Sequence, residues 1–556
     1  MNEMTIGTRG SRLSLVQTEI VKKKLEEKSP GIKIKVKTIK TEGDLRQKEP
    51  LDKISGSGVF AKEIEKALLR HKIDMAVHSL KDLPTDLPIG LTIGAVLDRG
   101  DTRDVLISNN GLSLQELPKA AVVGTSSLRR KSQILNLRPD LTVKEIRGNV
   151  DTRLEKLDAG EYDAVVLASA GISRSGLIGR ITEYLPISKM LPAPGQAALA
   201  VELREGDAEM EDLARKINDI DAQRAVSVER RFLSQLGGGC KVPIAAYADV
   251  NSGRTVLYGA VMDKEGKKII RGSMSASLSS NIDIGSELAM ELLEKGGAET
   301  LSSEDTPLKG KRILLTMSED SAKEVRNECL ELGMIPFGLP MIKIEPCSDY
   351  SELDKAIIGI ENYDWIVFTS QNSLRYFFFR LSANKISPQK ALGKIKIAAS
   401  GKVADSIKNC GIKIDAFPKE HTPEKFLELM GDLDGKRILI PESNISIGSI
   451  AKAAGKRGAS CDEIVSYMTL PMVYSSRHIL DILEKGIDFI IFASPSGVKS
   501  LAESVGNDNI GYINRSKLAY IGGVTAEEGR RCGLNVDMIP RESSTEGLMK
   551  AIRQHG

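Results

Sequence analysis

Short apolar runs alternate with amphipathic stretches along almost the whole chain, and this alternation limits the possible folds more than any other feature. Residues 73–80 (IDMAVHSL) and 163–171 (DAVVLASAG) have the length and composition of buried parallel strands. Residues 58–70 and 221–236 carry apolar side chains at helical spacing. Strands that alternate with helices in this way predict parallel α/β units, so we expect an α/β fold.

The length of 556 residues predicts several domains. A single hydrophobic core rarely serves so long a chain, and about 150 residues per domain suggests three to five of them. A polar segment rich in Ser, Thr and Gly spans roughly 296–311. We interpret it as the main boundary between two halves.

An internal repeat follows that boundary. GKRILL, which starts at residue 310, recurs as GKRILI from residue 435, and residues 363–374 recur as 487–498. A third match relates 399–418 to 521–540, and all three offsets lie between 122 and 125 residues. Any two strand–helix units look alike, but three ordered matches at one offset favour duplication. The second half should therefore form two similar α/β lobes, with a ligand in the cleft between them.

Charge and cysteine content exclude several classes of function. The net charge is only +3 among 78 basic and 75 acidic side chains, which predicts no nucleic-acid or membrane partner. The six cysteines and five histidines show no metal-ligand spacing, so we expect no metal, no disulfide framework and a reducing compartment. The first 20 residues contain no apolar signal segment, and no run approaches a membrane span. We expect a cytoplasmic protein.

Several predicted strand-to-helix turns combine small hydroxyl residues with arginine. Helix N-terminal amides, hydroxyls and a guanidinium fork together bind carboxylates or phosphates. One such turn could be a solvated helix start, but several of them predict a small polyanionic ligand. The residues concerned are Arg9, Ser11, Thr125, Ser126, Ser127, Arg129, Arg130, Arg147, Arg153 and Arg174.

Two further stretches each carry distinctive chemistry. In HSLKDLPTDLP (78–88), a predicted strand ends in Ser79, Lys81 and Asp82, where open α/β sheets place ligand contacts. The alternative is an ordinary strand end with a surface Lys–Asp pair. In LGGGCKVPIAAYADV, three glycines precede Cys240. This thiol is either a buried apolar group or the reactive tip of a flexible loop.

Six motifs together resemble the porphobilinogen deaminase (hydroxymethylbilane synthase) family over about residues 3–295. They are TRGSRLSLVQT, HSLKDLPT, GTSSLRRKSQI, RGNVDTRL, PAPGQAALA and GGGCKVPIAAYA. Residues 308–556 resemble uroporphyrinogen III synthase more weakly, through the repeat and through FTSQNSL, FASPSG and STEGL. The two families catalyse consecutive steps of tetrapyrrole synthesis, so a fusion is a coherent combination.

The first resemblance implies a dipyrromethane cofactor, attached to Cys240 by a thioether, as the primer for four porphobilinogen units. Asp82, with Lys81, is implied to be catalytic, because a carboxylate stabilises the positive charge that develops as ammonia leaves. The implied cofactor-binding residues are Cys240, Ser11, Ser79, Lys81, Asp82, Thr125, Ser127, Arg129, Arg130, Arg147 and Gly148. The implied substrate-binding residues are Arg9, Phe60, Arg153, Arg174 and Gln196. Two departures from the family are Ser57, in place of a frequent lysine, and Ala197, in place of glycine.

The second resemblance implies cyclisation of hydroxymethylbilane with inversion of the last ring, without a cofactor and mainly by positioning. Tyr467 is implied to assist departure of the hydroxyl group. The residues implied to line the cleft are Thr369, Ser370, Ser400, Ser494, Thr525, Ser544 and Thr545. Each of these could instead be a helix cap.

The two families also imply an architecture. The deaminase half should have two lobes like periplasmic binding proteins and a small α+β domain that carries Cys240, and the synthase half should have two flavodoxin-like lobes. The repeat alone divides the second half near residue 432, whereas the family inserts one lobe into the other. The expected segments are 1–97 plus 196–217, 98–195, 218–295, a linker at 296–309, 310–346 plus 474–556, and 347–473.

The sequence thus predicts a bifunctional, monomeric enzyme that converts porphobilinogen to uroporphyrinogen III through hydroxymethylbilane. One alternative is a non-catalytic anion-binding protein, which would need neither Asp82 nor the Cys240 loop. The other is an active deaminase fused to a synthase-like half that only binds or regulates.

Overall fold

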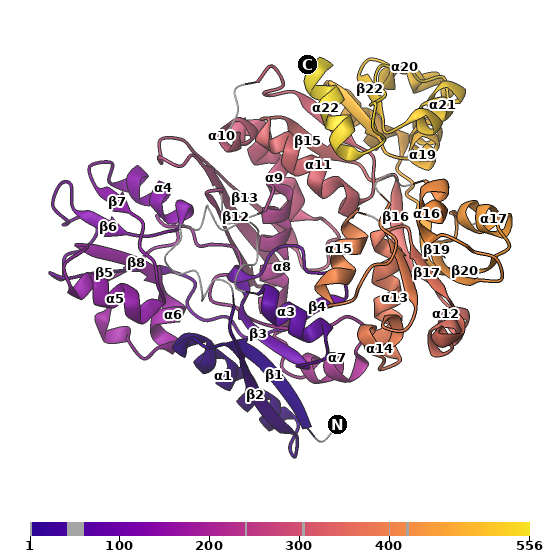
Figure 1. The fold of residues 1–556 in the computed structure, drawn as a ribbon. Helices are drawn as coiled ribbons and strands as arrows, with labels where there is room; N and C mark the ends of the chain where they lie inside the picture. The colour runs from indigo at the N-terminus through magenta and orange to yellow at the C-terminus, as the bar shows by residue number, and fades with distance from the viewer. Residues whose placement is uncertain are drawn as a thin grey trace.

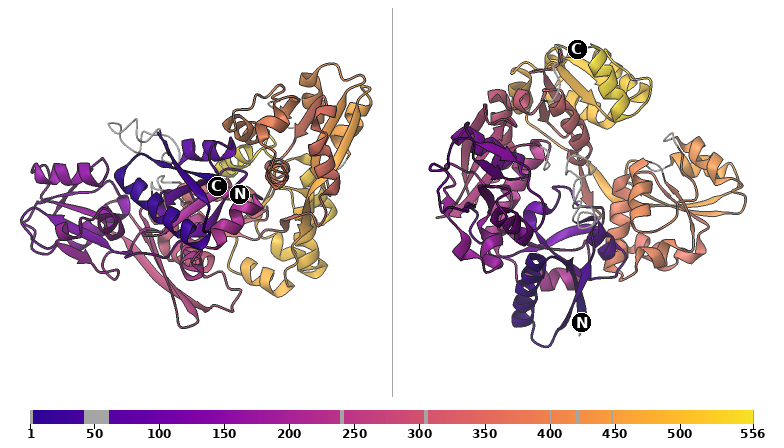
Figure 2. Two further views of the ribbon diagram at one scale, coloured as in Figure 1. Left: turned by 90° about the horizontal axis from the view of Figure 1, so that it is seen from below. Right: turned by 60° about the vertical axis from the view of Figure 1, so that its left-hand side comes forward.

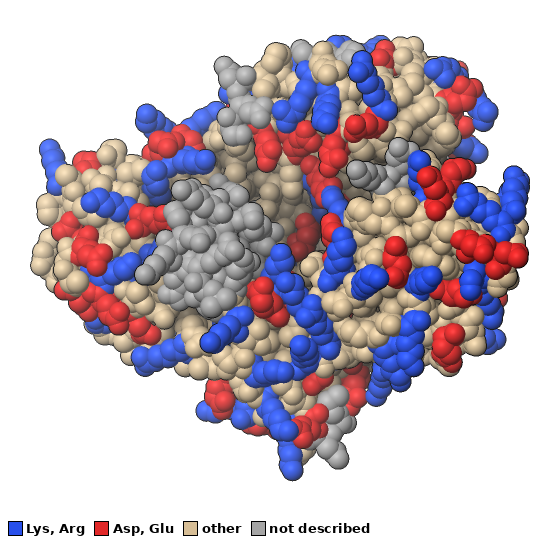
Figure 3. All heavy atoms as spheres, viewed as in Figure 1, with Lys and Arg blue, Asp and Glu red and all other residues tan. Residues whose placement is uncertain are grey.

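The computed structural model describes residues 3–41, 61–238, 242–302, 306–399, 401–418, 422–446 and 448–555. Within these ranges the chain is a mixed α/β structure with five sheets (Figure 1). None of the described helices is both long and apolar enough to span a membrane. Basic and acidic side chains are interspersed over the face drawn in Figure 3.

Sheet A has the strand order β2-β1-β3-β10-β4. Its first three strands are parallel, and β10 runs antiparallel to both of its neighbours. Met4 and Ile6 on β1 are buried against Val21 and Leu25 of α1, so the amphipathic pattern of this helix supplies the core. The elements are β1 (Glu3–Arg9), α1 (Arg12–Lys28), β2 (Lys33–Ile39), α3 (Lys62–Leu69), β3 (Met75–Ser79), η1 (Leu80–Asp82), β4 (Leu91–Val96), β10 (Leu199–Arg204) and α7 (Ala208–Arg215).

Sheet B has the order β7-β6-β8-β5-β9 and is formed entirely between two strands of sheet A in the sequence. Its central strand β8 is buried at four of its five positions, as expected for a strand with helices on both faces. The elements are β5 (Asp104–Ser108), β6 (Val122–Gly124), α4 (Leu128–Leu137), β7 (Thr142–Lys144), α5 (Val150–Asp158), β8 (Ala164–Ala168), α6 (Ser169–Arg174), η2 (Ile178–Arg180) and β9 (Glu183–Leu185).

Sheet C is an antiparallel sheet of consecutive strands, β11-β12-β13. Helices α8 and α9 cover it, with Phe232 and Leu288 packed against Leu257. The elements are α8 (Ile220–Gln235), β11 (Ile244–Asn251), β12 (Arg254–Met262), β13 (Ile269–Ser277), α9 (Ile284–Leu292), η3 (Leu293–Gly297) and α10 (Ala298–Leu301).

Sheet D has the order β15-β14-β21-β22, and its strands are all parallel. The repeated unit at 310 enters this sheet as β14, which pairs with β21 more than 170 residues later. The elements are β14 (Arg312–Leu315), α11 (Glu319–Glu331), β15 (Ile335–Gly338), α18 (Ser476–Leu483), β21 (Phe489–Phe492), α19 (Pro495–Val505), η5 (Asn507–Asn509), α20 (Ile510–Ile513), β22 (Lys517–Tyr520), α21 (Gly523–Arg531) and α22 (Thr545–His555).

Sheet E has the order β16-β20-β19-β17-β18. The second repeated unit, β19, pairs with β17, which precedes it in the chain. The elements are β16 (Ile342–Pro346), α12 (Ser351–Ile358), η4 (Ile360–Asn362), β17 (Trp365–Phe368), α13 (Gln371–Ala383), α14 (Pro388–Leu392), β18 (Lys396–Ala399), α15 (Gly401–Asn409), α16 (Pro423–Met430), β19 (Arg437–Ser443), α17 (Ser449–Gly455) and β20 (Ser460–Pro471).

The position of β16 differs from the expected division after residue 346. That division would place 342–346 with sheet D, but β16 pairs antiparallel with β20, from Ile342 opposite Pro471 to Pro346 opposite Tyr467. The reason is the other edge of β20: β19 pairs with one edge of this 12-residue strand, and β16 satisfies the backbone groups of the opposite edge at its C-terminal end.

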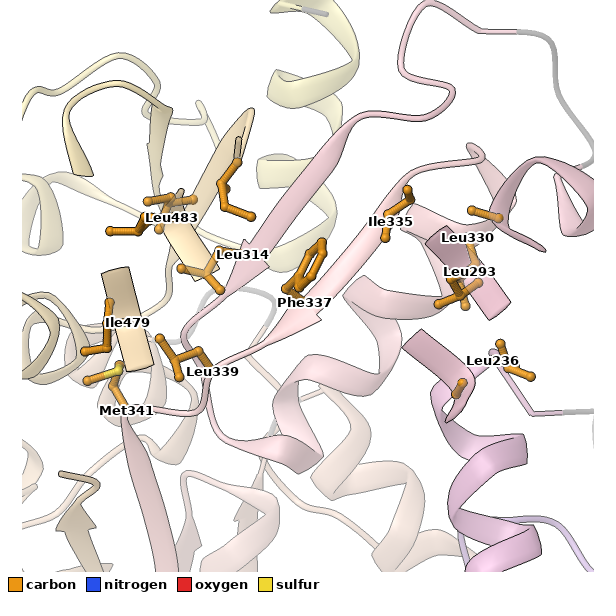
Figure 4. Close-up of a cluster of buried hydrophobic side chains, with 14 of the residues drawn as sticks. Leu236, Leu293, Leu314, Leu330, Ile335, Phe337, Leu339, Met341, Ile479 and Leu483 are labelled. Atoms are coloured by element: carbon orange, nitrogen blue, oxygen red, sulfur yellow. The ribbon is translucent and has the colours of Figure 1, made fainter. Parts of the chain in front are cut away.

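The two halves share hydrophobic cores. Leu236 and Leu293 of the first half lie in the same buried cluster as Leu330, Ile335 and Phe337 of the second (Figure 4). A second shared cluster joins the helix α3 to the helices of sheet E. In the right-hand view of Figure 2, the orange sheet E region lies beside the indigo and purple region, and the yellow C-terminal region adjoins the pink one.

Candidate active sites

Asp82 stands at the carboxyl end of β3, on the short turn η1. Leu80 and Leu83 on either side are buried, and Leu80 N–H donates to the Ala198 carbonyl at 3.0 Å. This anchoring leaves the Asp82 side chain exposed to solvent. A small cavity beside it is lined by Arg9, Ser14, Gln17, Ala61, Val77, His78, Ser79 and Asp82.

Lys81 points toward the neighbouring sheet B. Its Nζ donates to Gln196 Oε1 at 3.3 Å. Burial, followed by the positive charge of Arg130, lowers the pKa of Lys81 to about 8. Gln196 is itself buried and donates from Nε2 to Asp104 Oδ1 at 3.0 Å. A hydrogen-bonded path therefore joins the Lys81–Asp82 turn to the interior of sheet B.

Asp104 organises this interior, and no sequence motif singled it out. Its carboxylate is fully buried and accepts from Arg129 Nη1 at 2.7 Å and from Arg130 Nη2 at 2.7 Å. Burial alone would raise the pKa of Asp104, but the two guanidinium groups hold it far below its ordinary value. The only hint in the sequence is an acidic residue that opens the apolar run DVLIS.

Arg129 and Arg130 are therefore largely engaged within the protein. All three nitrogens of Arg130 donate to Asp104 or to the Val166 carbonyl. Arg129 Nη1 donates to Asp104 and to the Leu191 carbonyl, while the buried Nε of Arg129 has no partner among the described residues. Arg129 thus keeps a free donor, whereas Arg130 contributes mainly its charge.

Arg153 and Arg147 are the next two of the predicted site arginines. The charges of Arg130, Asp82 and Arg147 all act on Arg153, and burial is the first cause that lowers its pKa, to about 10. Arg147 Nε pairs with Glu145 at 2.9 Å, and its buried Nη2 has no partner in the described part of the chain.

Arg174 approaches from α6 and donates from Nη2 to the Ala197 carbonyl at 2.7 Å. Ala197 adopts a φ of +74°, a conformation that favours glycine, which is the residue that the family resemblance implies here. Burial lowers the pKa of Arg174, while Asp98 opposes this shift.

The expected hydroxyl ligands lie at helix starts. Ser11 caps α1 and accepts from Ser14 N–H at 3.2 Å, and Ser127 caps α4 and accepts from Arg130 N–H at 3.4 Å. Thr125 Oγ1 accepts from Ser127 N–H, and Ser79 Oγ accepts from Gln17 Nε2 at 2.9 Å. Ser11 and Ser127 are therefore helix N-caps, and the Ser11 hydroxyl also lies 2.7 Å from Ser14 Oγ.

Gly148 precedes α5 with a φ of +114°. A Cβ there would lie 2.6 Å from Thr152 Cγ2, so only glycine fits this turn. The turn orients the backbone between Arg147 and Arg153.

Cys240, Phe60 and Ser57 lie outside the described residues, but the approach to Cys240 is visible. Helix α8 ends at Gln235, and Gly237 follows with a φ of +81°. A Cβ on Gly238 would lie 2.9 Å from Thr85 Oγ1, three residues after Asp82. The glycines therefore let the chain that leads to Cys240 pass close to the Asp82 loop.

The second candidate site is built at the carboxyl end of β17. Ser370 caps α13, and its Oγ lies 3.2 Å from the Tyr467 hydroxyl on β20. Thr369 Oγ1 donates to Glu442 Oε1 at 2.6 Å. The structure thus brings together three of the expected residues and adds Glu442, which the sequence did not indicate.

Tyr467 and Glu442 are both buried. Burial raises the pKa of each, so the phenol of Tyr467 stays protonated well above neutral pH. Tyr467 also stacks on Tyr376, with ring centroids 5.8 Å apart, which fixes the direction of its hydroxyl.

The other expected synthase residues belong to sheet D. Ser494 caps α19, Thr525 is buried on α21, Ser544 Oγ accepts from Gly547 N–H at 3.0 Å, and Thr545 begins α22. Ser400 lies outside the described residues. Within the described ranges, no hydrogen bond joins these side chains to Thr369, Ser370 or Tyr467.

An exposed carboxylate at a strand end, together with buried and partly buried guanidinium groups on neighbouring α/β elements, is a set of charges suited to small polycarboxylate ligands. Comparison with known families identifies the class of protein. Residues 4–212 match the model for porphobilinogen deaminase, dipyromethane cofactor binding domain, and residues 223–294 match the porphobilinogen deaminase C-terminal domain. Residues 323–550 match uroporphyrinogen-III synthase HemD.

Curated relatives agree with the family models. The porphobilinogen deaminase of Syntrophomonas wolfei is 46% identical over 301 residues, which are 54% of this chain and 98% of that protein. The porphobilinogen deaminase of Thermus thermophilus is 47% identical over 303 residues, 54% of this chain and 99% of that protein. The chain therefore belongs to the porphobilinogen deaminase family, with a uroporphyrinogen-III synthase region fused after it.

Solved structures of uroporphyrinogen III synthases are among those similar to part of the chain. A mutant of the enzyme from the extremely thermophilic bacterium Thermus thermophilus is 18% identical and covers 44% of this chain and 98% of its own, with a TM-score of 0.34. The enzyme from Helicobacter pylori is 17% identical and covers 44% of this chain and 100% of its own, with a TM-score of 0.31.

Proposed function

We propose that the chain is a bifunctional enzyme of tetrapyrrole biosynthesis. Its first half polymerises four porphobilinogen molecules to hydroxymethylbilane with release of ammonia, and its second half cyclises this product to uroporphyrinogen III with inversion of the last ring. The observation that carries the proposal is the presence in one chain of an almost complete deaminase relative, matched over 98% of its length, and a HemD region.

The residues around Asp82 fit a dipyrromethane cofactor. Its acetate and propionate groups need cationic donors, and the buried Arg129 Nε and Arg147 Nη2 have no partner among the described residues. We assign these two nitrogens, together with Arg130 as a fixed charge and the hydroxyl groups of Ser11, Ser79, Thr125 and Ser127, to the cofactor. When bound through Cys240, the cofactor supplies the primer for chain growth.

Asp82 is the proposed catalytic group of the deaminase half. Its carboxylate is exposed at the mouth of the site, and its charge acts on Arg153 and on Lys81. As ammonia leaves porphobilinogen, positive charge develops on the pyrrole, and a preorganised carboxylate stabilises that charge. Lys81, which is readily deprotonated near its pKa of about 8, can hold or release a proton beside it.

Arginine side chains orient the substrate. Arg9, Arg153 and Arg174 are proposed to pair with its carboxylates, and Gln196 holds Lys81 in place through their hydrogen bond. Phe60 is proposed to lie over the site. The guanidinium groups fix the incoming pyrrole so that its aminomethyl carbon meets the end of the growing chain.

In the synthase half, the proposed group that assists departure of the hydroxyl is Tyr467. Its raised pKa keeps the phenol protonated, and its contact with Ser370 Oγ orients the proton. The proposed positioning residues are Thr369, Ser370, Ser400, Ser494, Thr525, Ser544 and Thr545.

We also propose a domain division supported by the sheets. Sheets A, B and C correspond to three deaminase domains, the first two like periplasmic binding proteins, and sheets D and E to two flavodoxin-like lobes. The proposed segments are 1–97 plus 196–217, 98–195, 218–295, a linker at 296–309, 310–341 plus 474–556, and 342–473. The enzyme is proposed to act as a cytoplasmic monomer.

The mass of the intact protein tests the cofactor assignment. The purified chain should be heavier than its sequence by one dipyrromethane, and Cys240→Ser should have the unmodified mass and no deaminase activity. Cys329→Ser is the matched control, because Cys329 is a fully buried thiol and should leave the adduct in place. An unmodified wild-type chain, or an adduct that survives in Cys240→Ser, would contradict the assignment.

A further inference from the structure

The two synthase sheets are joined to each other by little of the chain. Only residues 339–341 and 472–475 cross between sheets D and E in the described part of the structure, held by backbone hydrogen bonds such as Met472 N–H to the Met341 carbonyl at 2.9 Å. Lys402 of α15 and Glu324 of α11 add one ion pair between the lobes. A connection of two short segments permits hinge motion unless something else restrains it.

The sheet D lobe is attached to the deaminase half through α11. Glu319 accepts from Arg231 Nη2 at 2.9 Å and from Gln235 Nε2 at 3.1 Å, both on α8. Lys323 donates to Asp86 at 2.6 Å, on the loop that follows Asp82. We call this set of residues the α11 contact.

Apolar packing reinforces the α11 contact. Leu236, just after α8, shares a buried cluster with Leu330 of α11 and Ile335 of β15 (Figure 4). A Cβ on Gly237 would lie 3.2 Å from Leu330 Cδ1, so the helices are in close approach where the chain turns toward Cys240.

The sheet E lobe is attached to the deaminase half at a separate place, through α13. Arg375 pairs with Glu205 through both Nε and Nη2, at 3.2 and 2.9 Å, and Lys385 donates to Glu209 at 3.2 Å. We call these residues, with the packing described next, the α13 contact.

The α13 contact also has a tightly packed apolar part. A Cβ on Gly206 would lie 2.7 Å from the Phe379 carbonyl oxygen. Phe378 belongs to the same buried cluster as Leu68 and Leu69 of α3. The contact therefore combines charge pairing with the exclusion of water.

The two contacts hold both synthase lobes on one body. Rotation of either lobe about the two crossing segments would separate apolar surfaces and break ion pairs at the α11 or the α13 contact. We propose that the deaminase half braces the synthase half and sets the angle between its two lobes. Only the purpose of the brace depends on the proposed function. A fixed cleft lowers the entropy cost of ordering a flexible linear tetrapyrrole when it binds.

Distance measurements between the lobes test the brace in the full chain. Spin labels on p-acetylphenylalanine at Ile358 (α12) and Val524 (α21) would report the angle, because both side chains are exposed, at 65% and 79%. Pulsed electron resonance on the substrate-free protein should give one narrow distance distribution. A broad or bimodal distribution overturns the proposal.

Charge reversal then tests the cause. The double variant Arg375→Glu, Lys385→Glu places carboxylates opposite Glu205 and Glu209, so the distance distribution should widen at least about twofold. Adding Glu205→Lys and Glu209→Lys restores opposite charges and should restore the native width. Arg380→Ala is the matched control, because Arg380 lies on α13 but pairs with Asp354 of the same lobe, and it should leave the width unchanged. In the Arg375→Glu, Lys385→Glu variant, faster hydrogen exchange across residues 203–208 would show that the α13 contact has opened. If the distance distribution between the lobes nevertheless stayed narrow, the brace would be overturned. The distances are measured without substrate, so they do not depend on synthase activity. If the distance distribution were narrow but the second half had no synthase activity, the proposed function would be contradicted and the brace would stand.

Discussion

Asp82→Asn should lower the rate of ammonia release from porphobilinogen by at least about 100-fold while the protein remains folded. The loss follows from removing a preorganised charge that acts in the transition state, and such losses fall in the range of about 100- to 1000-fold. Folding should survive because the Asp82 side chain is exposed and its turn is anchored by Leu80 and Leu83. The measurement is steady-state ammonia release, with circular dichroism to verify the fold.

Asp98→Asn is the matched control for Asp82. Asp98 is an exposed aspartate just after β4 that pairs with Lys24, so its loss should leave the rate within about twofold. If Asp82→Asn retained a rate within tenfold of the wild type, the catalytic assignment of Asp82 would be wrong.

Asp104→Ala should destabilise the protein by about 3–5 kcal/mol, because it leaves the buried guanidinium groups of Arg129 and Arg130 without their counter-charge. Gln196 would also lose a partner, so the orientation of Lys81 should loosen. Urea unfolding, followed by the circular dichroism signal, measures the effect. Asp158→Asn, which removes an exposed partner of Arg180, should shift the midpoint little.

The same carboxylate should contribute to acid sensitivity. The folded-state pKa of Asp104 lies below its ordinary value of about 4, so its stabilising contribution is present above that value and is lost as the pH falls toward the folded-state pKa. Asp104→Asn should therefore show a flatter loss of stability below about pH 4 than the wild type. An equally steep acid limb in the variant would mean that other carboxylates carry this dependence.

Local patterns predicted the elements well. Strands such as β8 and β17 are short apolar runs that are almost wholly buried, and the turns with Ser11 and Ser127 start helices as their composition indicated. Asp104 and Glu442 could not be predicted in the same way. Each is a buried carboxylate whose partner lies more than 20 residues away, and only tertiary packing decides that pairing.

The arginines illustrate the same limit. Composition predicted a cationic site, but it could not divide the arginines into those that bind a ligand and those that bind the protein. Arg130 has its three nitrogens engaged by Asp104 and by the Val166 carbonyl, whereas Arg129 Nε and Arg147 Nη2 are left over among the described residues. That division depends on side-chain geometry, which has no periodic signature in the sequence.

The repeat shows how order in the chain and order in space can differ. Both synthase sheets place the GKRIL strand beside the strand of the FTS or FAS motif: β14 beside β21, and β19 beside β17. In sheet D the GKRIL strand precedes this partner in the chain, and in sheet E it follows it. Offsets alone suggested two tandem lobes, because a sequence repeat does not record which strands pair.

The product formed from porphobilinogen tests the central claim most directly. The purified full-length chain, incubated with porphobilinogen alone and oxidised to porphyrin for isomer separation, should yield mainly the type III isomer. Hydroxymethylbilane that leaves an inactive partner cyclises without ring inversion to the type I isomer, so an inactive second half would give type I only. A type III majority is the result that a bifunctional enzyme predicts. Type I alone, or no uroporphyrinogen at all, would contradict it.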